Sequence, residues 1–249
     1  MRLLRTLSAC ACIAASLLLA ACHSMPDQSA SSATAGAVTL DSLAIPVSAE
    51  ENRAVSFTNK RSAYYYTQTH RNEHPEHAHF RGFNIAGRRI FSDYWLIVAG
   101  AALDPQTATV IVRPDALIRT YPQGITETLR LFDGQDVVEV EVSGAKDDVT
   151  LQLSGDTVAH VQSAQGIDEF TATQAGDSSA VDHIVVGRSG NRFLIAVGSS
   201  REAARTLHDR AVASAPAWQD ARSERLAAVI NDDHYLSSDD PRLTEALRW

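Results

Sequence analysis

Cysteine is scarce in this chain of 249 residues, where it occurs three times. Cys10 and Cys12 lie in an apolar N-terminal stretch that has the features of a cleaved leader, so Cys22 would be the one cysteine of the mature protein. A single cysteine cannot form a disulfide within its own chain. We therefore expect the folded domain to be stabilised by its hydrophobic core rather than by cross-links.

Positive charge is also scarce. The sequence has 22 lysine and arginine residues against 30 aspartate and glutamate residues, which gives a formal net charge of −8. Loss of Arg2 and Arg5 with the leader would change this value to −10. Because nucleic acids present phosphates and favour basic surfaces, this balance argues against a nucleic-acid partner. Beyond the leader, no apolar run is long enough to span a bilayer.

Several catalytic and cofactor motifs are missing from the sequence. It has no Gly-rich phosphate loop, no G-x-S-x-G nucleophile motif and no H-E-x-x-H metal motif. Gly82 and Gly87, in "RGFNIAGRR", lack the spacing of a G-x-G-x-x-G dinucleotide fingerprint and are typical of turns. We identify no catalytic residue in this chain, and we expect no cofactor.

The N-terminal segment is typical of a secretory signal. Arg2 and Arg5 precede an Ala- and Leu-rich stretch that ends in "LAAC" at Cys22. These residues resemble the lipobox of bacterial lipoproteins, and the resemblance implies that residues 1–21 are removed and that Cys22 is acylated. His23 in the next position favours outer-membrane anchoring. The expected partner is thus a lipid bilayer and the expected location is the periplasm or cell envelope; an ordinary signal peptide with a free cysteine is the alternative.

The residues after the leader divide into a tether and a β-rich domain. Residues 22–36 are rich in Ser and Ala and have few large apolar side chains, which predicts a flexible tether. In "ITETLRLFDGQDVVEVEV", apolar and polar residues alternate on both sides of Asp133-Gly134, which predicts a hairpin with one buried face. The first strand of this hairpin carries Ile125, Glu127, Leu129 and Leu131 on one face. The second carries Glu139 and Glu141 at positions that we expect to face solvent.

Further alternating segments predict the fold class. "DVTLQLSG", "YWLIVAGAAL", "ATVIVRPDAL" and the two halves of "DHIVVGRSGNRFLIAVGSS" have the pattern of short strands, without helical segments between them. We therefore predict a mainly β protein, a large antiparallel β-sandwich over residues 37–200. Residues 201–235 have helical composition and predict linker helices, with Pro216 near the start of a second helical stretch.

The last residues, 236–249, have the pattern of a helix start. Polar residues and Pro241 provide an N-cap and a first helical position, and an apolar stripe follows. The stripe consists of Leu243, Ala246 and Leu247, followed by Trp249. A helix of this length is marginal in water by itself. We expect it to begin a larger helical domain; the alternative is that it packs back onto the sandwich.

Four stretches in this order resemble the front part of bacterial glycogen-debranching-type glycoside hydrolases. They are "FTNKRSAYYYTQTH", "HFRGFNIAG", "VIVRPDALIRTYPQGITETLRLFDGQDVVEVEV" and "YLSSDDPRLTEALRW". The resemblance covers about residues 50–249. It implies an N-terminal β-supersandwich, linker helices and the first helix of an (α/α)6 catalytic barrel, with a glycan bearing α-glucosidic bonds as substrate.

The resemblance places the catalytic carboxylates of such enzymes in the barrel, downstream of residue 249. Glycoside hydrolysis needs two of these groups. Since none can be carried over onto this sequence, we expect the chain by itself to lack hydrolase activity. The implied function is that of a non-catalytic domain that supports a barrel.

A histidine-rich segment, "HRNEHPEHAH", offers an alternative chemistry. Imidazole and carboxylate groups suit zinc, copper or nickel. However, Pro75 prevents a helix that would bring His70 and His74 together, and the spacing matches no closed zinc site. We interpret the segment as a solvated loop. A metal site is the alternative, with His70, His74, His77 and His79 as its candidate ligands.

The neighbouring segment "AYYYTQ" places Tyr64 and Tyr66 on one face of a strand and Tyr65 on the other. Aromatic faces can stack on sugar rings, although sheet packing is the simpler interpretation. We expect the segment from Tyr64 to Phe83 to shape access to a substrate. Its candidate residues are Tyr64, Tyr66, His79 and Arg81. A self-contained envelope lipoprotein that binds a glycan or a metal is the competing hypothesis for the whole chain.

Overall fold

The computed structural model describes residues 38–71, 73, 75–174, 177–232, 240 and 242–243. The expected signal peptide, the acylation site Cys22, the tether, His74 and most of the expected terminal helix with Trp249 lie outside these residues. Of the apolar stripe, Leu243 is described, and 51% of it is exposed. Among the described residues, no helix combines the length and apolar character needed to cross a membrane.

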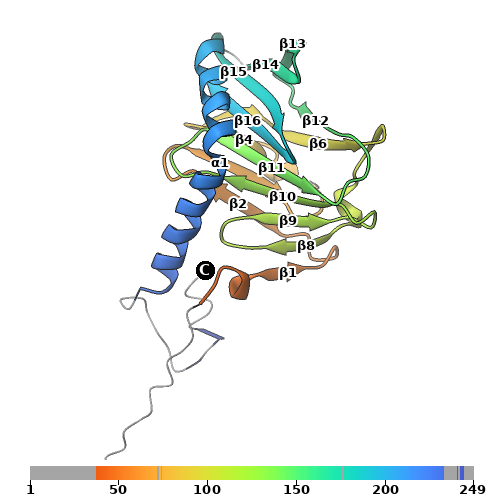
Figure 1. Ribbon diagram of the computed structural model, residues 1–249, viewed down its shortest axis with the longest axis vertical. Helices are drawn as coiled ribbons and strands as arrows, with labels where there is room; N and C mark the ends of the chain where they lie inside the picture. The colour runs from red at the N-terminus through yellow and green to blue at the C-terminus, as the bar shows by residue number, and fades with distance from the viewer. Residues whose placement is uncertain are drawn as a thin grey trace, which may run out of the picture. The chain divides into compact units, whose positions relative to one another are not determined.

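The largest sheet has nine antiparallel strands in the order β1-β8-β9-β10-β11-β16-β15-β14-β13 (Figure 1). In chain order these are β1 (Ile45–Val47), β8 (Thr109–Val112), β9 (Leu117–Thr120), β10 (Thr126–Leu131), β11 (Val137–Ser143), β13 (Val158–Ala164), β14 (Ile167–Gln174), β15 (Asp177–Ser189) and β16 (Arg192–Gly198). The prediction of a mainly β, antiparallel architecture is confirmed.

Two smaller antiparallel sheets lie against this sheet. One has the order β2-β3-β4-β5 and the other has the order β12-β6-β7. Their strands are β2 (Ala54–Thr58), β3 (Ala63–Gln68), β4 (Gly82–Ile85), β5 (Arg88–Phe91), β6 (Asp93–Val98), β7 (Ala101–Ala102) and β12 (Val149–Ser154). The described residues of this region also form three short 3-10 helices: η1 (Asp41–Leu43), η2 (Pro75–His77) and η3 (Pro105–Thr107).

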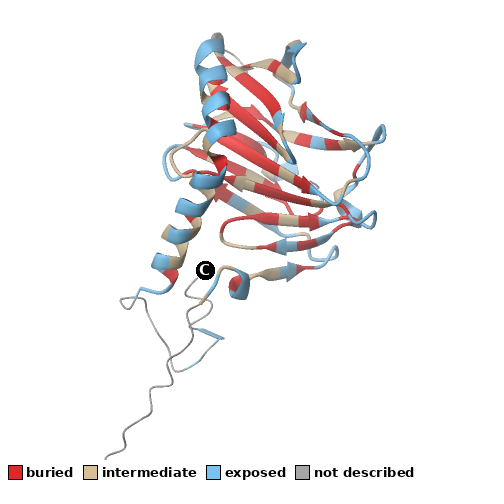
Figure 2. Cartoon of the chain, in the orientation of Figure 1, coloured by how far each residue is buried: buried red, intermediate tan, exposed pale blue. Residues whose placement is uncertain are grey.

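The core lies between the nine-stranded sheet and the two smaller sheets. One continuous cluster of buried side chains draws on all three sheets, and Figure 2 shows buried residues, in red, along most of the central strands of the large sheet. Aromatic rings join the smaller sheets, because the ring of Tyr65 on β3 lies 6.1 Å from the rings of both Phe91 and Tyr94. The predicted hairpin is present as β10 and β11, with Leu129 opposite Val140.

One carboxylate of this hairpin departs from its expected position. Glu139 was expected to face solvent, but it is fully buried, while Glu141 is half-buried. Both lie on the outer face of the sheet beside Arg130, and Arg192 approaches Glu139 to 3.4 Å. The arginine side chains cover the carboxylate, which alternation alone does not reveal. Burial raises the pKa of Glu139, and the two arginines act against that shift.

Helix α1 (Arg201–Ile230) lies on the outer face of the nine-stranded sheet, next to β15 and β16 (Figure 1). Ser200 caps it by accepting a hydrogen bond from the Ala203 N–H. The two expected helical stretches are one continuous helix, in which Pro216 lies on the exposed side. Ala215 and Trp218 pack against the sheet on either side of the proline, and this packing holds the helix together.

Two glycines let α1 approach the sheet closely. A Cβ at Gly187 on β15 would overlap the imidazole of His208, and a Cβ at Gly198 would overlap the helix backbone at Ala204. Ion pairs then fix the helix at two places along its length. Glu169 on β14 accepts hydrogen bonds from Arg201 and Arg205, and Asp133 accepts them from Arg222 and Arg225.

Candidate functional site

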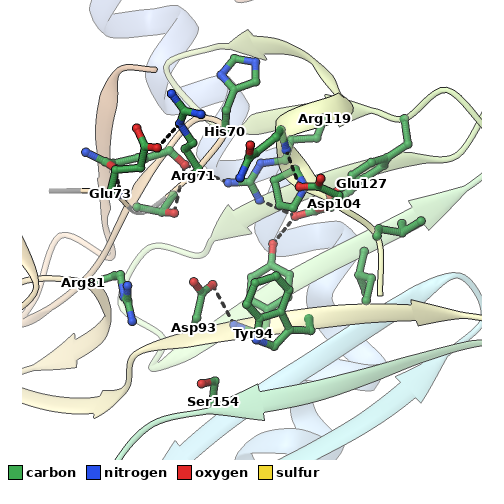
Figure 3. A pocket seen from close by; sticks show the side chains of 18 residues that line it. His70, Arg71, Glu73, Arg81, Asp93, Tyr94, Asp104, Arg119, Glu127 and Ser154 are labelled. Carbon is green, nitrogen blue, oxygen red and sulfur yellow. Dashed lines mark hydrogen bonds and ion pairs between the residues drawn. The ribbon is translucent and has the colours of Figure 1, made fainter. Parts of the chain in front are cut away.

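A cavity of about 340 Å³ opens where the two smaller sheets meet β9 and β10 of the nine-stranded sheet (Figure 3). It is lined by β3, β6, β9, β10, the segment after β3, and the segment that contains η3. The charged side chains on its lining are Arg71, Glu73, Arg81, Asp93, Asp104, Arg119 and Glu127. Neutral polar residues and Trp95, which is 41% exposed, accompany them.

The floor of the cavity is a buried ion pair between two neighbouring strands. Arg119 on β9 lies opposite Glu127 on β10, and its Nη1 donates to Glu127 Oε1 at 2.9 Å. The remaining nitrogens of Arg119 donate to the backbone carbonyls of Thr69, at 2.9 Å, and Gln68, at 3.0 Å. Every hydrogen-bonding nitrogen of the guanidinium therefore has an acceptor, as a buried charge requires.

Two tyrosines complete the surroundings of Glu127. The hydroxyl of Tyr94 donates to Oε1, and that of Tyr121 donates to Oε2 at 2.5 Å. Burial raises the pKa of both tyrosines well above the usual range, and the Glu127 carboxylate adds to the shift. The phenols thus stay protonated as donors. With both oxygens occupied, Glu127 acts as the counter-ion of Arg119 and not as a free acid.

Polar groups on the rim of the cavity are held by local contacts. Arg71 and Glu73 form an exposed ion pair at 2.6 Å. Asp104 caps η3 by accepting from the Gln106 N–H at 3.0 Å, and Asp93 accepts from the Tyr94 N–H at 2.9 Å. A carboxylate has about four acceptor positions, so one local contact does not prevent it from accepting from a hydroxyl group as well.

Arg81, one of the residues expected to shape substrate access, lies in the cavity wall. Figure 3 places it across the cavity from Arg119. Among the described residues, the Nε atom of Arg81 is buried and has no hydrogen-bond partner. Gly82, which follows it, has φ +89° and lies so close to the Phe91 carbonyl that a Cβ would overlap it. This close approach brings the start of β4 against the end of β5 and fixes the direction of the chain next to Arg81.

The other access residues lie elsewhere. Tyr64, Tyr66 and His79 are not on the cavity lining. Tyr65 is buried in the core, and Tyr66 lies on the opposite face of β3, where its hydroxyl lies 2.7 Å from His77 Nδ1. The separation of Tyr65 from its two neighbours therefore agrees with the expected strand pattern. The face that carries Tyr66 packs against the segment Pro75–Phe80.

The candidate metal ligands do not gather within the described part of the chain, where no group of three or more His, Cys, Asp or Glu side chains is placed to hold an ion. His70 is buried, and its imidazole points away from the Arg119–Glu127 pair (Figure 3). Burial lowers the pKa of His70, and the charge of Arg119 adds to the shift. The ring of His79 lies against the ring of Phe80, with 3.8 Å between centroids and 44° between the ring planes.

Most of the cavity residues were not found from the sequence. Glu127 carried a signal, since it shares a strand face with Ile125, Leu129 and Leu131 and a charge among apolar residues indicates a buried polar contact. No comparable local signal marks Trp95, Asp93 or Asp104. Comparison of the chain with protein-family models, curated proteins and solved structures finds no match.

Proposed function

We propose that this domain binds a sugar unit of a glycan in the cavity next to Arg81. The observation that carries the proposal is the combination of groups on the lining. Arg81 supplies hydrogen-bond donors, Asp93 and Asp104 supply acceptors, and Trp95 supplies an aromatic ring. Sugar hydroxyls both donate and accept, and the apolar face of a sugar ring packs on aromatic surfaces. A small number of convergent polar groups in a concave site is the usual form of a small-molecule site.

Charge on the lining favours a neutral ligand. Arg71, Arg81 and Arg119 face Glu73, Asp93, Asp104 and Glu127, which leaves the lining close to balance. A strongly anionic ligand would be repelled by the carboxylates, and a strongly cationic one by the arginines. Hydroxyl groups satisfy both kinds of side chain without a charge of their own.

The proposed role is binding without catalysis. Hydrolysis of a glycosidic bond needs one carboxylic acid to protonate the leaving oxygen and a second carboxylate as base or nucleophile. The most buried carboxylate of the cavity, Glu127, has both oxygens engaged by Arg119 and the two tyrosines. We infer that the domain positions a glycan for a separate catalytic unit.

The resemblance to glycogen-debranching-type hydrolases supports a specific version of this role. In that version the sandwich braces an (α/α)6 barrel, the glycan carries α-glucosidic bonds, and acylated Cys22 anchors the protein in the cell envelope. The order of the resembling stretches supports it. A metal-binding role for the histidine segment has no supporting contact among the described residues.

Isothermal titration calorimetry with glucose, maltose and isomaltose tests the sugar site. Arg81→Gln should weaken binding by about tenfold or more, since hydrogen bonds to a charged group contribute about 1.5–3 kcal/mol. Arg61→Gln is the matched control, because Arg61 is exposed and does not line the cavity. Absence of binding for all three sugars, or equal losses in the two variants, would overturn the proposal. Release of glucose from maltose by the purified chain would overturn its non-catalytic part.

A further inference from the structure

A cluster of aromatic side chains lies on the surface next to the cavity wall. It consists of Tyr66, His77, His79 and Phe80, which we call the aromatic patch. The rings of Tyr66 and His77 meet edge to face at 5.9 Å, and Tyr66 lies 6.3 Å from Phe80. Phe80 is 45% exposed, and its ring lies next to these other aromatic rings rather than alone on the surface. The proposed sugar site does not use this patch.

The patch is held rigidly by polar contacts to its backbone. Asn84, buried on β4, donates through Nδ2 to the Phe80 carbonyl at 2.9 Å. Arg89 on β5 donates to the Ala78 carbonyl at 2.7 Å, and the Tyr66 hydroxyl lies 2.7 Å from His77 Nδ1. An exposed ring on a fixed backbone can bind a ligand with little loss of conformational freedom.

The patch and the cavity meet at two consecutive residues. The side chain of Phe80 is exposed on the patch, whereas that of Arg81 lines the cavity. Consecutive Cα atoms are about 3.8 Å apart, so both side chains start from the same short stretch of the cavity wall, and a ligand that crosses the wall at Arg81 passes the backbone that carries Phe80. The segment Pro75–Arg81 thus has the cavity on one side and an aromatic surface on the other.

We infer that the ligand is an oligosaccharide chain, one unit of which occupies the cavity while the next units cross the wall and stack on Phe80. This inference rests on the proposed sugar site and adds the direction in which the chain leaves it. The His79 and Phe80 rings are 3.8 Å apart between centroids and tilted by 44°, so the imidazole covers part of one face of Phe80 and supports that ring, which is still 45% exposed. Stacking tolerates different linkages, whereas the hydrogen-bonding cavity selects the unit.

Dependence of affinity on chain length tests the inference. The full chain is titrated with glucose, maltose and maltotetraose. The wild type should bind maltotetraose about three- to tenfold more tightly than glucose, in line with the contribution of one or two aromatic contacts. Phe80→Ala should bind glucose as the wild type does and lose most of the gain with length. Phe80→Trp should retain the gain.

Val161→Ala is the control, because Val161 is an exposed apolar residue on β13 outside the patch. Equal affinity of the wild type for all three sugars overturns the chain path and leaves the cavity proposal standing. A loss of glucose binding in Phe80→Ala also overturns it, since the patch would then be part of the cavity. If glucose, maltose and maltotetraose all fail to bind, the proposed function itself fails.

Discussion

Replacement of Glu127 by Gln tests whether the floor of the cavity is a desolvated ion pair. Glu127 is 2% exposed, and Arg119 is 7% exposed. The substitution keeps the size of the side chain and one carbonyl oxygen, so it introduces no void. It removes the negative charge opposite Arg119. It also replaces one carboxylate oxygen by an amide nitrogen, so that either Tyr94 or Tyr121 loses the acceptor of its hydroxyl group.

The expected loss follows from this geometry. Unit charges 2.9 Å apart interact by about 6 kcal/mol at an effective dielectric constant of about 20. The Gln carbonyl and the backbone acceptors of Arg119 recover part of this energy. Removing one partner of a buried pair typically costs about 3–5 kcal/mol, and we expect a loss in free energy of unfolding within that range. For a domain of about 200 residues, the melting temperature should fall by roughly 6–20 °C.

Urea unfolding followed by circular dichroism measures the effect. Glu73→Gln is the matched control, since it makes the same substitution in another glutamate–arginine pair. Both members of that pair, Arg71 and Glu73, are exposed. Exposed pairs contribute at most about 1 kcal/mol, so this variant should unfold close to the wild type. A loss below about 1 kcal/mol in Glu127→Gln would refute the reasoning, because it would mean that water reaches Arg119 and replaces the carboxylate.

Three further predictions concern packing and charge elsewhere. Gly187→Ala should destabilise the protein by about 1–3 kcal/mol in urea unfolding, because the added Cβ would overlap His208. In a double-mutant cycle with His208→Ala the two losses in free energy of unfolding should not add. Additive losses would count against this contact. Gly82→Ala should lower the free energy of unfolding by more than about 2 kcal/mol. The substitution strains the backbone at φ +89°, and its Cβ also overlaps the Phe91 carbonyl. Near-native stability would contradict the close approach.

The third compares Glu139→Gln with Glu169→Gln across the acid range. Burial raises the pKa of Glu139 in the folded protein. The contribution of Glu139 to the free energy of unfolding is therefore present below the pKa of the unfolded state, and it is lost as the pH rises through the pKa of the folded state. Burial also acts to raise the pKa of Glu169, but Arg205 and Arg201 outweigh this effect, and the pKa is lowered. The contribution of Glu169 to the free energy of unfolding is therefore present above the pKa of the unfolded state, and it is lost as the pH falls through the pKa of the folded state. The stability differences from wild type should therefore change with pH in opposite directions, and slopes of the same sign would show that one assignment is wrong.

Local patterns in the sequence were sufficient for much of the fold. Alternation around Asp133-Gly134 predicted β10 and β11, and the two halves of "DHIVVGRSGNRFLIAVGSS" lie in β15 and β16, as expected. Both signals depend on a period of two residues and on turn chemistry, which act over a few neighbouring positions. The same reasoning divided the helical region at Pro216, where contacts of α1 with the sheet keep the helix continuous.

The sequence by itself indicated several of the strands, their antiparallel arrangement, and the position of Glu127 on an apolar strand face. Only the tertiary structure decided that Arg119, Glu127 and Tyr94 meet, that Arg81 lines the cavity while Phe80 is exposed, and that arginines cover Glu139. The physical reason is the range of the interactions. Strand formation depends on neighbours along the chain, whereas a cavity depends on how three sheets pack, and side chains far apart in sequence supply its groups.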